Sequence, residues 1–263
     1  MNIDFAKTAK DYAQHRVGFP EEFFERLAEA GILKAGCRAL DLGTGTGLVA
    51  RELAKRGADV VGLDLAGALL LEAQRLDQEA GLSVRYVEAP AEKMGLENQS
   101  FDLILAGQCW HWFDRPKVLQ QIKKVLRPNG ILVIAHFDWL PIRDSMVAAT
   151  ESLILKYSPK WELGGGTGLY PQWLPEISAE GFTQIETGSF DLDVSYSPED
   201  WRGRIRASAG VAASLSPEKV SAFDMDLRKI LEDHFPQRPL KVPHRVWWAS
   251  SRNTGVKSDG NRL

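Results

Sequence analysis

The clearest sign of chemistry in this sequence is a glycine-rich segment between two acidic residues. Asp41-Leu42-Gly43-Thr44-Gly45-Thr46-Gly47 follows a short apolar stretch, and Asp64 ends the next one. Glycine lets the backbone turn sharply and lets a ligand approach closely, and the helix that follows begins with free N–H groups. A carboxylate at the end of the next strand can accept hydrogen bonds from both hydroxyls of a ribose. The alternative is a tight strand-helix turn that binds nothing.

The spacing of these glycines separates two classes of ligand. A site for NAD reads Gly-x-Gly-x-x-Gly, whereas this sequence reads Gly-x-Gly-x-Gly with Leu48 at the sixth position. Asp41 would also repel a pyrophosphate, because both are negatively charged. The same carboxylate suits a ligand with a positive amino group, such as the methionine part of S-adenosylmethionine. An NAD-dependent oxidoreductase is therefore the less favoured alternative.

A histidine among aromatic residues follows the fourth apolar stretch. His111 has a side chain whose ordinary pKa lies near neutrality, so it could act as a general base. It could equally pack between Trp110 and Trp112 and contact the cofactor. Adjacent aromatic side chains cannot all face one direction, so we expect some of them, including Trp112, to line a substrate pocket.

Other residues that could bind ions show weaker patterns. The histidines and cysteines lack the spacing of a metal site, so we expect no metal. Arg202, Arg204 and Arg206 could bind an anionic substrate. A run of this kind is more often the solvated face of a helix, and that interpretation is favoured.

Strand and helix signals alternate through the first half and would position these residues. Strands are expected over 37–42, 59–65, 83–89, 101–107 and 131–137, and helices over 21–30, 48–56, 66–80 and 115–126. This alternation predicts an α/β protein of Rossmann-like type, with a central, mostly parallel, seven-stranded sheet and helices on both faces. Ligands of such sheets bind at the carboxyl ends of the strands.

The pattern changes after Phe137. Helices are expected over 142–157, 171–181 and much of 198–235, and strands over 183–196 and 244–250. We expect the helices to form a lid that shapes the substrate pocket, with Gly164-Gly165-Gly166-Thr167-Gly168 as a hinge or mobile loop. A static helical layer that only completes the core is the alternative.

The composition indicates a globular protein with a sizeable core. The chain has 263 residues, 44% hydrophobic and 25% charged, and a net charge of -3. This charge argues against phosphate-dominated binding to nucleic acid. We identify no signal peptide and no apolar stretch near the roughly 20 residues of a membrane span. With only two cysteines, Cys37 and Cys109, a disulfide framework is not expected, and we expect a cytoplasmic location.

Taken together, the motifs of the first half resemble those of the class I S-adenosylmethionine-dependent methyltransferases, in their methyltransferase type 11 group. Residues 39–47 resemble the cofactor loop, 60–65 the ribose-binding strand, 89–94 the adenine segment and 125–130 the turn before the fifth strand. A narrower resemblance, to trans-aconitate methyltransferase-like proteins, rests on 108–114 and on 5–16, although Val17 stands where that branch usually has proline.

The resemblance implies a set of binding residues. Asp41 would lie near the ammonium group of S-adenosylmethionine, Asp64 would bind its ribose, and Leu65 would pack on its adenine. The full set of implied cofactor residues is Tyr12, Arg16, Asp41, Gly43, Thr44, Gly45, Gly47, Asp64, Leu65, Ala91, Glu92, Gly107 and Gln108. Pro90 replaces a polar residue that is common in the family, which puts one side-chain contact to adenine in doubt.

These observations define the functional expectations. The chain would transfer a methyl group to a small-molecule acceptor, at an oxygen such as a carboxylate, with His111 as the candidate catalytic residue. The acceptor would contact Trp112, Trp173, Trp201 and Arg206, and the protein would be a monomer or homodimer that binds neither nucleic acid nor membrane. A non-catalytic S-adenosylmethionine-binding module is a further alternative. The expected divisions are a helical cap (1–34), the cofactor core (35–137), further strands with the lid (138–253) and a disordered tail (254–263).

Overall fold

The structure, a computed structural model, describes residues 17–208, 210–211 and 214–255. The chain forms two compact units. We call the first the sheet unit; its described residues are 18–136, 170–189 and 247–255. We call the second the helix unit; its described residues are 17, 137–169, 190–208, 210–211 and 214–246.

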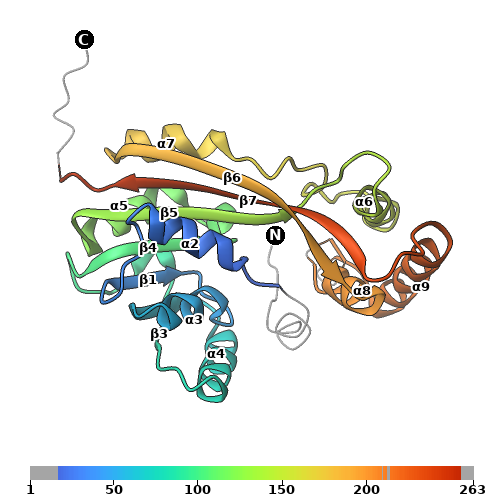
Figure 1. Cartoon of the computed structure of the whole chain (residues 1–263), viewed down its shortest axis with the longest axis horizontal. Helices are drawn as coiled ribbons and strands as arrows, with labels where there is room; N and C mark the ends of the chain where they lie inside the picture. The colour runs from blue at the N-terminus through green and yellow to red at the C-terminus, as the bar shows by residue number, and fades with distance from the viewer. Residues whose placement is uncertain (1–16, 209, 212–213, 256–263) are drawn as a thin grey trace, which may run out of the picture. The chain divides into compact units, whose positions relative to one another are not determined.

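Seven strands form one sheet in the order β3-β2-β1-β4-β5-β7-β6 (Figure 1). The strands are β1 Arg38–Leu42, β2 Asp59–Asp64, β3 Arg85–Glu88, β4 Phe101–Gly107, β5 Leu126–Trp139, β6 Thr183–Tyr196 and β7 Leu240–Arg252. The pairs β1–β2, β1–β4, β2–β3 and β4–β5 are parallel. The predicted seven-stranded, mostly parallel sheet is therefore confirmed.

The last strand runs against its neighbours. Asn129 N–H donates to Asn253 O, and Leu140 N–H donates to Pro243 O, so residue numbers rise along β5 as they fall along β7. The arrow of β7 in Figure 1 accordingly points opposite to those of β5 and β6. One antiparallel strand thus lies between two strands of the opposite direction.

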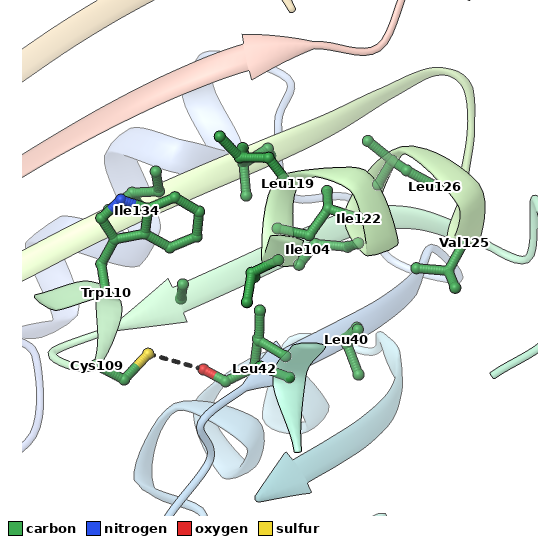
Figure 2. Packing of buried hydrophobic residues seen from close by; sticks show 14 of the residues in the cluster. Leu40, Leu42, Ile104, Cys109, Trp110, Leu119, Ile122, Val125, Leu126 and Ile134 are labelled. Atoms are coloured by element: carbon green, nitrogen blue, oxygen red, sulfur yellow. Dashed lines mark hydrogen bonds between the residues drawn. The ribbon is translucent and has the colours of Figure 1, made fainter. Parts of the chain in front are cut away.

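The helices of the sheet unit occupy the segments between the parallel strands. They are α2 Glu21–Glu29, α3 Leu48–Lys55, α4 Gly67–Glu79 and α5 Arg115–Val125, with the short turns η2 Ala91–Lys93 and η3 Trp110–Trp112. Each helix agrees with its prediction to within a few residues, because apolar periodicity and glycine stops are local signals. Figure 2 shows Leu119 and Ile122 of α5 packed toward Ile104 of β4, in the same buried cluster as Trp110.

The start of β5 differs from its prediction. The sequence predicts a turn at Pro128-Asn129-Gly130 before a strand at Ile131, yet the strand already begins at Leu126. The register jumps from Phe101–Leu126 to Leu103–Ile131, so the turn is an irregularity within the strand, with Asn129 at φ 63°. Asn253, the residue after β7, forms hydrogen bonds with the backbone of this irregularity. The N–H of Asn129 donates to Asn253 O, and the N–H of Asn253 donates to Gly130 O.

The second half contains shorter helices than its sequence predicted. α6 Met146–Tyr157, α8 Pro198–Arg206 and α9 Pro217–His234 lie in the helix unit. Each begins after a serine whose hydroxyl accepts an N–H of the first turn, namely Ser145, Ser197 and Ser216. The helix expected over 171–181 is instead the turn η4 Pro171–Trp173 followed by α7 Leu174–Ala179, and it belongs to the sheet unit. No helix in the described part of the chain is long and apolar enough to span a membrane.

Candidate functional site

The glycine-rich segment forms a tight loop at the carboxyl end of β1. The backbone φ values of Gly43, Gly45 and Gly47 are 69°, 55° and 77°. Residues that carry a Cβ rarely adopt this left-handed region. The N–H groups of Gly43 and Thr44 donate to Leu63 O at 2.8 and 3.0 Å, which fixes the loop against β2. The loop therefore depends on glycine at all three positions.

Asp41 is a buried carboxylate at the start of this loop. Its Oδ2 accepts the Thr44 hydroxyl at 2.6 Å and the Ala50 N–H at 3.0 Å, and no described residue donates to Oδ1. Burial raises the pKa of Asp41 to about 7, although both hydrogen bonds lower it. A cationic group of a ligand beside Oδ1 would favour the charged carboxylate.

Asp64 joins the end of β2 to the glycine loop. Its Oδ2 accepts the N–H of Gly45 at 2.8 Å and its Oδ1 accepts the N–H of Ala66 at 2.9 Å. A carboxylate has about four lone-pair sites, so both oxygens can still accept a hydroxyl. The next residue, Leu65, is 71% exposed, which leaves an apolar surface beside the carboxylate.

The end of β4 adds a strained backbone position to this edge of the sheet. Gln108 has φ 62°, uncommon for a residue other than glycine, and its N–H donates to Ala135 O at 2.9 Å. A Cβ on Gly107 would lie 3.0 Å from Phe19 and 3.1 Å from Val49, so the strand end is tightly packed. Strained backbone of this kind gathers at functional sites.

The segment after β3 lies at the same edge, because β2 and β3 pair in register from Val61–Arg85 to Asp64–Glu88. Ala91 is buried within η2. Glu92 is half-buried, and its Oε1 accepts the N–H of Asp114 at the start of α5 at 3.0 Å. Glu92 therefore has a structural contact in addition to its predicted place beside the adenine.

His111 and Trp112 lie in the turn η3 that follows β4. Trp112 is 45% exposed, whereas Trp110 is fully buried and packs edge-on against Phe113. The His111 ring lies 4.5 Å from that of Trp112 and 5.3 Å from that of His136 on β5. Two imidazoles and an exposed indole thus meet next to the ends of β4 and β5.

Sequence reasoning did not single out His136 as a site residue. It is 2% exposed and packs against the rings of Tyr170 and Trp173, at 4.3 and 5.0 Å. It lies within an apolar stretch that predicts a buried strand, so nothing in the local sequence marked it as a site residue. Its proximity to His111 comes from the register of Gly107 with Ala135, which only the sheet defines.

Three residues predicted to contact the substrate make packing or polar contacts within the protein. Trp173 is 4% exposed and stacks on Tyr170 with an interplanar angle of 7°. Trp201 is fully buried in the helix unit, where its Nε1 donates to the Thr150 hydroxyl at 3.2 Å. Both side chains are thus enclosed by packing within their own units, and their contact with the acceptor stays a prediction.

Arg206 is the third of these residues. It forms ion pairs with Asp224 at 2.6 Å and Glu199 at 2.9 Å, and Arg202 binds the same two carboxylates. Arg202 and Arg206 thus lie in ion pairs on one helix face rather than on a simply solvated one. Arg204 differs, since its guanidinium lies 5.1 Å from the centre of the Trp139 ring and burial lowers its pKa.

Two predicted cofactor residues, Tyr12 and Arg16, lie outside the described residues. The rest of the predicted cofactor set comes together in the sheet unit, at the carboxyl ends of β1 to β4. Among the described residues no group of three or more His, Cys, Asp or Glu side chains could hold a metal ion.

Cys109 supports the loop from the other side and was not predicted to do so. Its Sγ donates to Leu42 O at 3.0 Å (Figure 2). A Cβ on Gly43 would lie 2.8 Å from both its Cβ and its Sγ. The small residue at position 43 is therefore required by packing as well as by φ.

The chain is similar to known methyltransferases. The family profile described as "Methyltransferase domain" matches residues 40–134. An uncharacterized methyltransferase of Mycobacterium tuberculosis is 34% identical over 133 residues, which are 50% of this chain and 51% of that protein. The match thus spans about half the length of such curated relatives.

Two further similarities extend over more of the chain. A ubiquinone biosynthesis O-methyltransferase of Azorhizobium caulinodans is 29% identical over 60% of this chain and 63% of its own length. The solved structure of a proposed type II methyltransferase from Anaeromyxobacter dehalogenans has a TM-score of 0.64 and 23% identity, and it covers 90% of this chain and 98% of its own. At that identity the second similarity establishes the fold alone.

Proposed function

We propose that the protein is a class I S-adenosylmethionine-dependent methyltransferase that transfers a methyl group to an oxygen atom of a small molecule, since residues 40–134 match the family described as "Methyltransferase domain". The observation that carries the proposal is the pair of carboxylates, Asp41 and Asp64, held on either side of one left-handed glycine loop.

The residues of the loop fit the amino-acid part of this cofactor. The unbonded Oδ1 of Asp41 suits an ammonium group, and the ammonium would compensate the burial of the carboxylate. A pyrophosphate there would meet a like charge, which argues against NAD. Gly43, Gly45 and Gly47 bring backbone rather than side chains to the ligand.

The neighbouring strand ends fit the nucleoside. Asp64 keeps lone pairs for the two ribose hydroxyls, and the exposed Leu65 offers an apolar face for adenine. Ala91 and Glu92, after β3, and Gly107 and Gln108, at the end of β4, are the other proposed cofactor contacts at this edge of the sheet. Tyr12 and Arg16 remain proposed contacts of the cofactor carboxylate.

The bound cofactor would supply an electrophilic methyl group on a sulfonium. The protein's own task is then to hold an acceptor oxygen in line and to keep water away, since charge is lost rather than built in such a transfer. An acceptor carboxylate is ionised near neutral pH and needs no base. For an acidic hydroxyl, His111 is the proposed base, and the exposed Trp112 is the proposed acceptor contact.

An oxygen acceptor agrees with the Azorhizobium relative, whose name specifies O-methylation. We further propose that the segment 138–253 selects the acceptor, that the protein acts in the cytoplasm as a monomer or homodimer, and that neither nucleic acid nor membrane is its partner. The net charge of -3 supports the last of these points.

Calorimetry with S-adenosylhomocysteine and NAD tests the cofactor, since tight binding of NAD alone would refute it. Extracts incubated with the protein and S-adenosylmethionine carrying a labelled methyl group then test the acceptor. Mild base releases methanol from a methyl ester but leaves methyl ethers and methylamines intact. Label released as methanol supports a carboxylate, label stable to base on oxygen supports a hydroxyl, and label on nitrogen or carbon overturns the oxygen proposal. Asp64→Ala, which we expect to bind the cofactor at least about tenfold more weakly, serves as a control of lower activity.

A further inference from the structure

A buried polar cluster, Arg51, Asp77 and Tyr86, lies under the glycine loop, and the proposed cofactor contacts do not include it. Arg51 and Asp77 are 8% and 3% exposed, and Tyr86 is half-buried. Such groups are expensive to bury unless they are fully hydrogen-bonded. The hydrogen bonds that these three groups make are therefore the feature to explain.

The three side chains come from three elements that each adjoin one cofactor segment. Arg51 lies on α3, which follows the glycine loop, and Asp77 lies on α4, which follows Asp64 and Leu65. Tyr86 lies on β3, which leads into the segment of Ala91 and Glu92. A contact among these three side chains therefore links the segments proposed to bind the amino-acid part, the ribose and the adenine of the cofactor.

Asp77 is the centre of this contact. Its Oδ1 accepts Arg51 Nη1 at 3.1 Å, and its Oδ2 accepts the Tyr86 hydroxyl at 2.8 Å. Burial, and then the hydrogen bond to Asp77, raises the pKa of Tyr86 above its usual range, so the phenol keeps the proton that it donates. With both oxygens bonded, the carboxylate fixes the three elements in one arrangement.

The cluster also touches the glycine loop directly. A Cβ on Gly47 would collide with the Tyr86 hydroxyl and would lie 2.8 Å from Arg51 Nη1. A Cβ on Gly62 would lie 2.6 Å from Tyr86 Cε1 and 2.9 Å from the Thr44 hydroxyl. Thr44 in turn donates to Asp41. A single Cβ at position 62 would thus meet both the Tyr86 ring and the hydroxyl that bonds the carboxylate proposed to bind the ammonium group.

We propose that Arg51, Asp77 and Tyr86 are positioning residues for the cofactor, which hold the glycine loop, the end of β2 and the segment after β3 at their binding distances. Stability alone does not require a polar cluster here, because apolar side chains of similar volume replace a buried ion pair at little or no loss of stability. Directional bonds to one carboxylate, in contrast, define the relative placement of three loops.

The test compares two tyrosines that make the same contact. Tyr86→Phe removes the donor to Asp77, and Tyr157→Phe, the control in the helix unit, removes a donor to Asp226 at 2.9 Å. Calorimetry on the full chain at 25 °C, with folding checked by circular dichroism, gives the Kd for S-adenosylhomocysteine. We expect Tyr86→Phe to raise this Kd at least about threefold, since the lost bond is to a charged acceptor. Tyr157→Phe should leave it within threefold of wild type.

A second variant keeps the proposal testable if single changes unfold the chain. Arg51→Met with Asp77→Leu removes both charges together and should fold, yet bind S-adenosylhomocysteine at least about threefold more weakly. A purely structural role predicts lower melting temperatures with Kd values within threefold of wild type, and that result would overturn the proposal. The inference rests on the proposed cofactor: wild type that binds no S-adenosylhomocysteine refutes both, whereas normal binding by wild type and Tyr86→Phe refutes only this one.

Discussion

The carboxylate of Asp64 accepts a hydrogen bond from the backbone N–H of Gly45 at 2.8 Å, so the end of β2 is fastened to the middle of the glycine loop. The second carboxylate oxygen accepts the N–H of Ala66 at 2.9 Å. From the sequence we expected Asp64 to bind the ribose of the cofactor. The structure gives it a second role, because its hydrogen bonds shape the glycine loop.

The first prediction concerns this double role. Asp64→Ala should weaken S-adenosylhomocysteine binding at least about tenfold, because charge-assisted bonds to two hydroxyls are worth roughly 1.5–3 kcal/mol each. It should also lower the free energy of unfolding of the apo-protein by about 1–3 kcal/mol, because two backbone donors lose their acceptor. Calorimetry and urea unfolding measure the two effects. An unchanged Kd would show that Asp64 does not bind the cofactor. An unchanged free energy of unfolding would show that its hydrogen bonds to Gly45 and Ala66 do not stabilise the loop.

The second prediction concerns the buried charge of Asp41, whose pKa burial raises from 3.8 to about 7. Between these values the unfolded chain is ionised while the folded chain keeps its proton, so this group lowers the stability of the apo-protein as pH rises, and the loss is complete above about pH 7. Asp41→Asn removes the titration, while the oxygen of the new amide can still accept from Thr44 and Ala50, which both bond one oxygen in wild type.

The stability of Asp41→Asn relative to wild type should therefore rise by roughly 3 kcal/mol from pH 5 to pH 8.5, at 1.36 kcal/mol per unit. Denaturant unfolding of both proteins at the two pH values measures it. The same variant should bind S-adenosylhomocysteine more weakly at pH 8, where wild type presents a carboxylate to the ammonium. A stability difference that does not change with pH would contradict the prediction.

The third prediction concerns Gly62, which lies in the middle of β2 without a positive φ. Gly62→Ala should destabilise the protein by about 1–3 kcal/mol, because the new Cβ would overlap Tyr86 and the Thr44 hydroxyl. Gly18→Ala is the control, since its Cβ would meet only Leu48, at 3.8 Å. Thermal unfolding compares them. Equal melting temperatures for the two variants would show that Tyr86 does not pack against β2 in this way.

The fourth prediction concerns the glycine-rich segment expected to be a hinge. The N–H of Gly165 donates to Glu151 at 2.8 Å, and the other oxygen of this buried glutamate accepts Trp139 Nε1. We expect the Gly165 amide to exchange slowly with solvent in wild type and fast in Glu151→Ala. Glu162→Ala, a change of an exposed glutamate nearby, should leave its exchange slow. Fast exchange of Gly165 in wild type would instead favour the mobile loop.

The sequence alone was sufficient for β1 to β4, for α2 to α5 and for the motif around Asp41 and Asp64. Apolar periodicity, helix stops and glycine spacing act between residues close in the chain, so they can be read without coordinates. The same locality explains the errors after Phe137. There, apolar patterns predicted helices but not that Trp201 is enclosed within the helix unit or that Trp173 packs in the sheet unit.

Only the tertiary structure decided which distant side chains meet. The pairing of His111 with His136 follows from strand register, and the bond of Tyr86 to Asp77 follows from the packing of β3 against α4. Gly62, a glycine inside a buried strand, was the one local sign that something approaches closely there, but the identity of its neighbour depends on residues 24 positions away along the chain. Contacts of this kind are set by how elements pack, which no local pattern encodes.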